Sequence, residues 1–133
     1  MSAVITKPKV DIAPDLLRQI EAQIHEAGQV VLHFLIKNPS TQEAGIRIWP
    51  TSYLYDLGSD HVSELMHVEN ITMYPTWQWI SGLSKTYFTL IFSGLPKACD
   101  AFSFKELCSN QAGAWCVDRI VRNNSDVYFL EIS

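Results

Sequence analysis

The stretch that decides the fold is YFTLIFSGLPK, residues 87–97, the densest run of β-branched and aromatic residues in the chain. Phe88, Leu90 and Phe92 recur at every second position, the period at which the side chains of a β-strand share one face. The residues between them are also largely apolar, which predicts a central strand covered on both faces. The sequence SGLP at 93–96 ends this strand, because Gly adopts unusual φ values and Pro cannot donate to a strand ladder.

Further strands are predicted on both sides of this one, and turn clusters rich in Gly, Pro, Asn, Asp and Ser separate them. The segments that read as extended are 30–37, 46–55 with a bend at Pro50, 62–73, 102–107, 115–120 and 127–132. Within 102–106 the alternation predicts buried Phe102 and Phe104 and an exposed Ser103. Turn signals recur about every 8 to 15 residues without repeated helices between them, which predicts an all-β, antiparallel β-sandwich of about seven or eight strands.

The length of 133 residues fits one domain with a core of its own. Residues 1–14 hold two prolines and no sustained periodicity, and we predict a flexible N-terminal segment there, followed by a single domain over 15–133. The apolar residues of 15–27 match both helical spacing and the alternation of a strand, so a short N-terminal helix and a strand both stay open. The strand is favoured because 30–37 needs an antiparallel neighbour nearby.

The composition excludes several classes of partner. A net charge of −4 with scattered basic residues argues against nucleic acid, and no apolar run has the roughly 18 residues of a membrane span. The N-terminus lacks the pattern of a signal peptide. The three cysteines, Cys99, Cys108 and Cys116, form an odd number, which favours reduced thiols in a cytoplasmic protein and leaves one disulfide with a free thiol as the alternative.

Five segments together resemble the immunoglobulin-like β-sandwich accessory domains common in Bacteroidetes-type bacteria. They are VVLHF at 30–34, TSYLYD at 51–56, ENIT at 69–72, FTLIFSGLPK at 88–97 and FSFKE at 102–106. The resemblance covers roughly residues 17–132, and its most specific part is the aromatic strand with its LPK turn and the FxFxE strand. It implies an immunoglobulin-like fold and brings no shared catalytic residues.

No catalytic residue, metal ligand or cofactor is predicted. The histidines His25, His33, His61 and His67 and the three cysteines lack the close pairing of a structural zinc site. Ser93 follows a strand but lacks the Gly-x-Ser-x-Gly elbow of a nucleophile, and we interpret it as a turn residue. Gly-rich phosphate loops and calcium loops are also missing from the sequence.

The aromatic residues are the most informative candidates for a binding surface. Trp77 and Trp79 share one face if their segment is extended, and Tyr74 and Trp49 lie beside prolines near strand ends. The alternative is that two of these tryptophans fill the core. Our first hypothesis is a non-enzymatic module that binds a protein partner or a second copy of itself. A carbohydrate-binding module built on these four residues is the second, and an enzyme whose site the sequence does not reveal is the third.

Overall fold

The computed structural model describes residues 3–5, 28–109 and 114–132, and these residues form an all-β fold, as predicted. Within them there are strands and turns but no helix. The strands are β1 (Ala3–Ile5), β2 (Gln29–Lys37), β3 (Ala44–Ile46), β4 (Ser52–Asp56), β5 (Val62–Glu69), β6 (Gln78–Ile80), β7 (Lys85–Ser93), β8 (Ala101–Glu106), β9 (Cys116–Val121) and β10 (Val127–Ile132). The helix or strand predicted at 15–27 lies outside the described residues. The segment 1–14 contributes β1, and its residues 6–14 are likewise not described.

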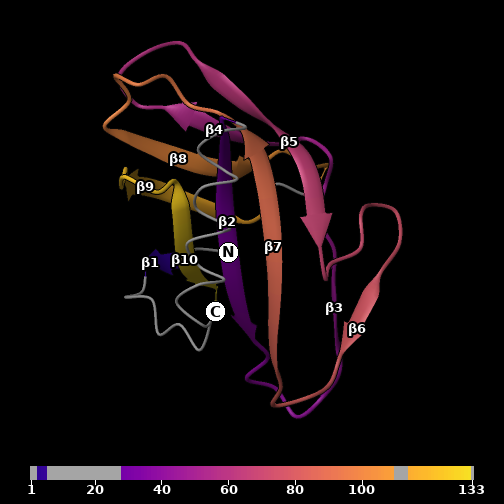
Figure 1. Ribbon diagram of the computed structural model, residues 1–133. Coiled ribbons are helices and arrows are strands. Elements are labelled where there is room, and N and C mark those ends of the chain that lie inside the picture. The colour runs from indigo at the N-terminus through magenta and orange to yellow at the C-terminus, as the bar shows by residue number, and fades with distance from the viewer. Residues whose placement is uncertain (1–2, 6–27, 110–113, 133) are drawn as a thin grey trace.

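Eight strands form one curled sheet in the order β1-β10-β2-β7-β5-β4-β8-β9, while β3 and β6 form a separate two-stranded ribbon. In Figure 1, β4 and β8 cross over the ends of β2 and β7, and the β3–β6 ribbon runs along one side. The curl brings β1 next to β9, the strand at the other end of the order. The structure is therefore one bent sheet with an attached ribbon.

The sheet is mixed, which corrects the prediction that every pair is antiparallel. β10 runs parallel to β2, with Leu130 opposite Phe34, whereas the other strand pairs are antiparallel. Turn sequences reveal the direction of strands joined by hairpins. β2 and β10 are separated by most of the chain, so no local turn reports how they pair.

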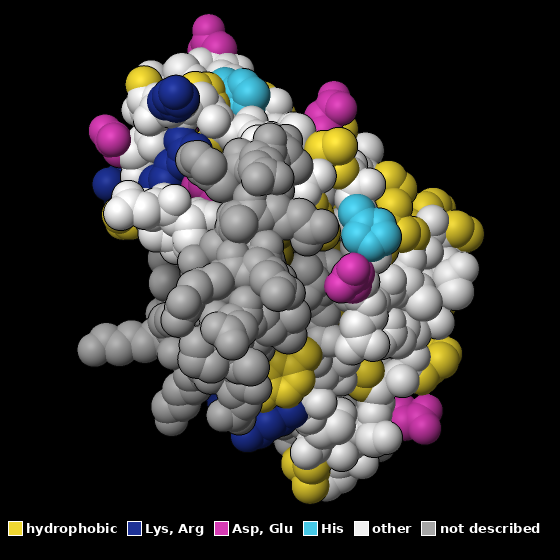
Figure 2. Space-filling view, viewed as in Figure 1, with side chains coloured by type: hydrophobic (Ala, Val, Ile, Leu, Met, Phe, Trp, Pro, Cys, Tyr) yellow, Lys and Arg dark blue, Asp and Glu magenta, His cyan; other side chains and the backbone are white. Residues whose placement is uncertain are grey.

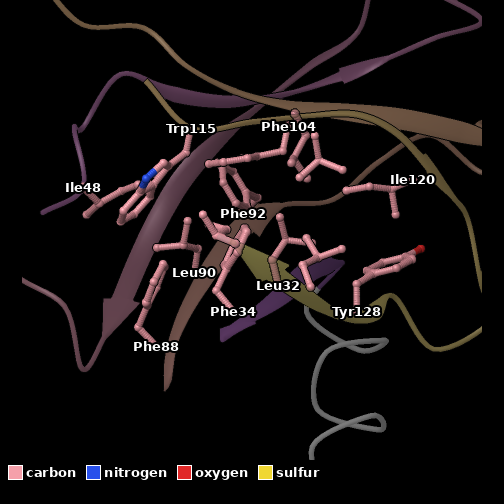
Figure 3. Close-up of a cluster of buried hydrophobic side chains, with 14 of the residues drawn as sticks. Leu32, Phe34, Ile48, Phe88, Leu90, Phe92, Phe104, Trp115, Ile120 and Tyr128 are labelled. Atoms are coloured by element: carbon pink, nitrogen blue, oxygen red, sulfur yellow. The ribbon is translucent and has the colours of Figure 1, made fainter. Parts of the chain in front are cut away.

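The core lies between the two halves of the curled sheet, and β7 is central to it, as predicted. Phe88, Leu90 and Phe92 are 0–2% exposed. Figure 3 shows them beside side chains of β2 and facing those of β8 and β9. The other face of β7 is covered only in part, because Tyr87 is 64% exposed whereas Ile91 packs against a small second cluster.

Two details of the sequence prediction were wrong. Gly94 does not adopt a left-handed φ; it is required because a Cβ there would lie 2.1 Å from the carbonyl oxygen of Gly28. Ser103 is buried rather than exposed, although Lys105, two residues further along the same strand, is exposed as the alternation predicts. Among the described residues, no helix could cross a membrane.

Candidate functional site

The four aromatic residues singled out in the sequence lie together at the β3–β6 ribbon. Trp49 and Tyr74 stack with ring centroids 3.9 Å apart, and the centroids of Trp77 and Trp79 are 6.4 Å apart. Arg47 joins the two pairs, because its guanidinium lies over three of the rings. We call these five residues the aromatic cluster.

A glycine in β3 lets the two exposed tryptophans lie close to the ribbon. Gly45 pairs with Trp79 across the ribbon. A Cβ on Gly45 would lie 3.0 Å from the Trp77 ring and 3.3 Å from the Trp79 ring. The Trp77 ring lies against Gly45 in β3 and against Arg47, which directly follows the end of this strand. Half of Trp77 nevertheless stays exposed.

Arg47 is held by aromatic rings more than by hydrogen bonds. Its guanidinium carbon lies 3.6 Å from the ring centroid of Trp77, 4.7 Å from that of Tyr74 and 5.6 Å from that of Trp49. One Nη donates to the carbonyl oxygen of Pro75 at 3.0 Å. Its Nε is buried and has no hydrogen-bond acceptor among the described residues.

The cluster faces solvent. Trp79 is 65% exposed, Trp77 49% and Tyr74 43%, whereas Trp49 is partly buried. Figure 2 shows exposed hydrophobic side chains along the side of the molecule where Figure 1 places β5, β6 and the connection between them. The alternative that two of these tryptophans fill the core is therefore wrong. The tryptophan that packs in the core is Trp115, stacked on Phe88.

A groove of about 490 Å³ adjoins the cluster. It runs between the end of β2, strand β3 and the chain that follows β8, and three tryptophans form part of its wall. Its volume lies within the range of about 300–1,000 Å³ that is usual for small-ligand sites. The residues that line it are Ile36, Lys37, Asn38, Pro39, Ala44, Gly45, Ile46, Arg47, Trp49, Trp77, Ile80, Glu106, Cys108, Ser109 and Trp115.

Glu106 connects two parts of the groove wall through hydrogen bonds of its side chain. Its carboxylate oxygens accept hydrogen bonds from the backbone N–H of Trp49 at 3.1 Å and of Trp115 at 3.2 Å. Burial raises the pKa of Glu106, although these two bonds and the charge of Arg47 act in the opposite direction. The carboxyl group therefore fixes the backbone positions of two groove tryptophans.

The sequence analysis missed Arg47, Glu106 and Trp115. The signal for Arg47 was its place two residues before Trp49, which puts both on one face of an extended chain. The signal for Glu106 was its register with Phe102 and Phe104, because an acid that continues an apolar face is turned towards the core. No pattern in the sequence near Trp115 linked this residue to Arg47 or Glu106.

The candidates for catalysis are dispersed. His33 stacks on Phe129 and contacts the Thr89 hydroxyl, while His67 lies near Glu69 on β5. His25 is outside the described residues. The groove brings Glu106 near Cys108, but no histidine is among the described residues that line it. No group of three or more potential metal ligands occurs within the described ranges.

One serine and one histidine do lie in contact. The Ser63 hydroxyl is 2.9 Å from Nε2 of His61 and donates to the carbonyl oxygen of Gly94 at 3.1 Å. Ser63 is fully buried, and its proton is directed at a carbonyl rather than at a base. Ser93, the other serine considered, accepts a hydrogen bond from the backbone N–H of Glu64. Neither has the geometry of an activated nucleophile.

None of the three cysteines forms a disulfide in the structure. Burial raises the pKa of Cys99 to about 11, so this thiol is protonated and unreactive near neutral pH.

Comparisons with protein-family models, curated proteins and solved structures give no match to this chain. Functional inference therefore rests on the geometry of the aromatic cluster and its groove.

Proposed function

We propose that the chain is a non-enzymatic binding module and that it binds carbohydrate at the aromatic cluster. The observation that carries this proposal is that Trp77, which lines the groove, lies beside Trp79, and that the two side chains are 49% and 65% exposed. The apolar face of a sugar ring packs on such surfaces, and neighbouring polar side chains bind its hydroxyl groups.

The polar groups needed for such a ligand are close by. Arg47, Asn38 and Ser109 line the groove beside its tryptophans. Asn38 Nδ2 already donates to the backbone carbonyls of Gln42 and Ser81, so its role is to hold the turn at the groove's end. Arg47 and Ser109 remain as the groups that contact ligand hydroxyls.

The test is a tryptophan-fluorescence titration with a panel of soluble polysaccharides, repeated by affinity electrophoresis. A spectral shift is expected with at least one glycan, and Trp79→Ala should weaken that binding at least tenfold. Gly45→Val should also weaken binding, because its side chain would push both rings from the ribbon. Tyr87→Ala is the matched control, since Tyr87 is as exposed as Trp79 but lies on β7. Equal binding by all variants would refute the proposal.

A protein partner or a second copy of the chain is the other candidate. Trp, Tyr and Arg are the residues that dominate protein interfaces, and the partly exposed Met73 extends the cluster. Light scattering and pull-down from host lysate test this reading. Concentration-dependent association that Trp79→Ala abolishes, without any glycan response, would favour it over carbohydrate.

Two broader assignments are also proposals. The order of strands and turns, with FTLIFSGLPK leading into FSFKE, supports a relationship to bacterial immunoglobulin-like accessory domains. Three cysteines without a disulfide support a cytoplasmic location, because thiols persist there in reduced form. Fractionation of host cells with an antibody to the chain tests the location, and recovery from an exported fraction would contradict it.

A further inference from the structure

Arg47 carries hydrogen-bonding capacity that the protein does not use. A guanidinium presents several N–H donors in a planar fork. Among the described residues, Arg47 makes one hydrogen bond, from one Nη to Pro75, and its other Nη makes none; its Nε has no acceptor but is buried and out of reach of a ligand. Arg47 also lines the groove. A cation with unused donors therefore borders a cavity that is large enough for a small ligand.

The guanidinium is also fixed in orientation. Trp77 lies under it at 3.6 Å and Tyr74 at 4.7 Å, and Tyr74 is in turn stacked on Trp49. An arginine held in this way loses little conformational freedom when it forms a bidentate pair, which is the arrangement it makes with carboxylates. The aromatic rings thus prepare Arg47 for a planar anion.

Among the described residues that line the groove, Arg47 is the cation that forms no ion pair. Lys37 also lines the groove, at the end of β2, but its charge is paired with Glu131, whose carboxylate lies 2.6 Å from its Nζ. Glu106 is the acid of the groove lining, and its oxygens already accept from two backbone N–H groups. A ligand carboxylate at Arg47 would therefore pair with the guanidinium, while the oxygens of Glu106 keep their own backbone N–H donors.

We propose that the sugar bound by this chain carries a carboxylate, as uronic acids do, and that the fork of Arg47 binds this carboxylate while Trp77 and Trp79 pack on the rings. The inference rests on the proposed carbohydrate function and names its ligand class, acidic glycans. Charge-assisted hydrogen bonds of about 1.5–3 kcal/mol predict a preference of roughly 10- to 100-fold for the acid over its neutral ester.

The experiment compares two ligands that differ only in this charge. Isothermal titration calorimetry at low ionic strength would measure binding of oligogalacturonate and of its fully methyl-esterified form. Wild-type protein should prefer the acid. Arg47→Gln should bring the two affinities together by weakening the acid alone, and Arg47→Lys should restore only part of the preference. Arg119→Gln, which removes an exposed cation on β9, is the matched control.

Near-ultraviolet circular dichroism of the Arg47 variants would show whether the tryptophans keep their packing. If the wild type binds acid and ester equally, or if Arg47→Gln weakens both by the same factor, the acidic-ligand inference is wrong and the carbohydrate function stands. Failure of wild-type protein to bind either ligand also overturns the inference. If the wider glycan panel fails too, and Trp79→Ala changes nothing, the proposed function itself is lost.

Discussion

Replacement of Phe92 by Ala tests the core on which the whole structure depends. Phe92 is fully buried in β7, where it pairs with Val30 of β2 and Leu65 of β5. Its ring meets that of Phe104 edge to face at 6.0 Å, so it joins the two halves of the curled sheet. Figure 3 shows the ring at the middle of the cluster. We expect Phe92→Ala to be among the most destabilising truncations in the chain.

The magnitude follows from three contributions. Burial of a phenylalanine side chain is worth about 1.5–3 kcal/mol, and an aromatic pair adds roughly 0.5–1.5 kcal/mol. The cavity left between two packed layers costs more, because β2 and β5 hold β7 in place and the site cannot close around the smaller side chain. The sum is about 3–5 kcal/mol, a large fraction of the roughly 5–15 kcal/mol that stabilises a domain.

Urea denaturation followed by tryptophan fluorescence measures this loss. Lys97→Ala is the control, because Lys97 is exposed beyond the end of β7 and its removal should change stability by less than about 0.5 kcal/mol. A reduced midpoint with an unchanged slope is expected for Phe92→Ala. Similar midpoints for the two variants would refute the placement of Phe92 between the layers.

Three further changes test individual side chains by urea denaturation. Burial lowers the pKa of His33, so its stabilisation is full above about pH 6.5 and is lost as the pH falls through the lowered pKa; His33→Phe should abolish this loss. Glu106→Gln should cost about 1–3 kcal/mol, since an amide nitrogen would face one of two bound N–H groups. In the wild type, the stabilisation linked to the raised pKa of Glu106 is full below about pH 4.5 and is lost as the pH rises through that raised pKa; Glu106→Gln should abolish this pH dependence, because glutamine does not titrate. Arg122→Lys should cost about 1.5–3 kcal/mol by breaking the paired bonds to Asp126, while the exposed Arg119→Lys should be neutral, and equal stabilities would contradict this.

The fold class could be predicted because strand periodicity and turn chemistry are local signals. The alternation in 87–93 identified β7 and its buried face correctly, and the turn residues at 123–126 correctly preceded β10. The features that the sequence did not predict depend on contacts between distant parts of the chain. The parallel pairing of β10 with β2 depends on how the sheet curls, and the separation of the β3–β6 ribbon depends on contacts between distant segments. Neither leaves a pattern within a short window of sequence.

The site could be predicted in part for the same reason. Trp49, Tyr74, Trp77 and Trp79 stood out by residue type and spacing, and the structure brings them together. The groove beside them is lined by residues from 36–49, from 77–80 and from 106–109 with Trp115, which lie far apart in the chain, so its volume could not be inferred from any one of these segments. Two of the three rings that contact Arg47, those of Tyr74 and Trp77, belong to the connection between β5 and β6, so the sequence around Arg47 does not reveal these contacts.

The cluster is separable from the core, and this separation supports a role in binding. The core already contains a tryptophan, Trp115, stacked on Phe88 between the layers. Trp79, by contrast, is 65% exposed. A smaller polar residue at position 79 could also pack against Gly45, and it would leave no indole ring in water. Exposed large aromatic side chains do little for folding, because stability comes from apolar area that leaves water. Their grouping around Arg47 is thus better explained by a ligand that covers them than by the stability of the sheet.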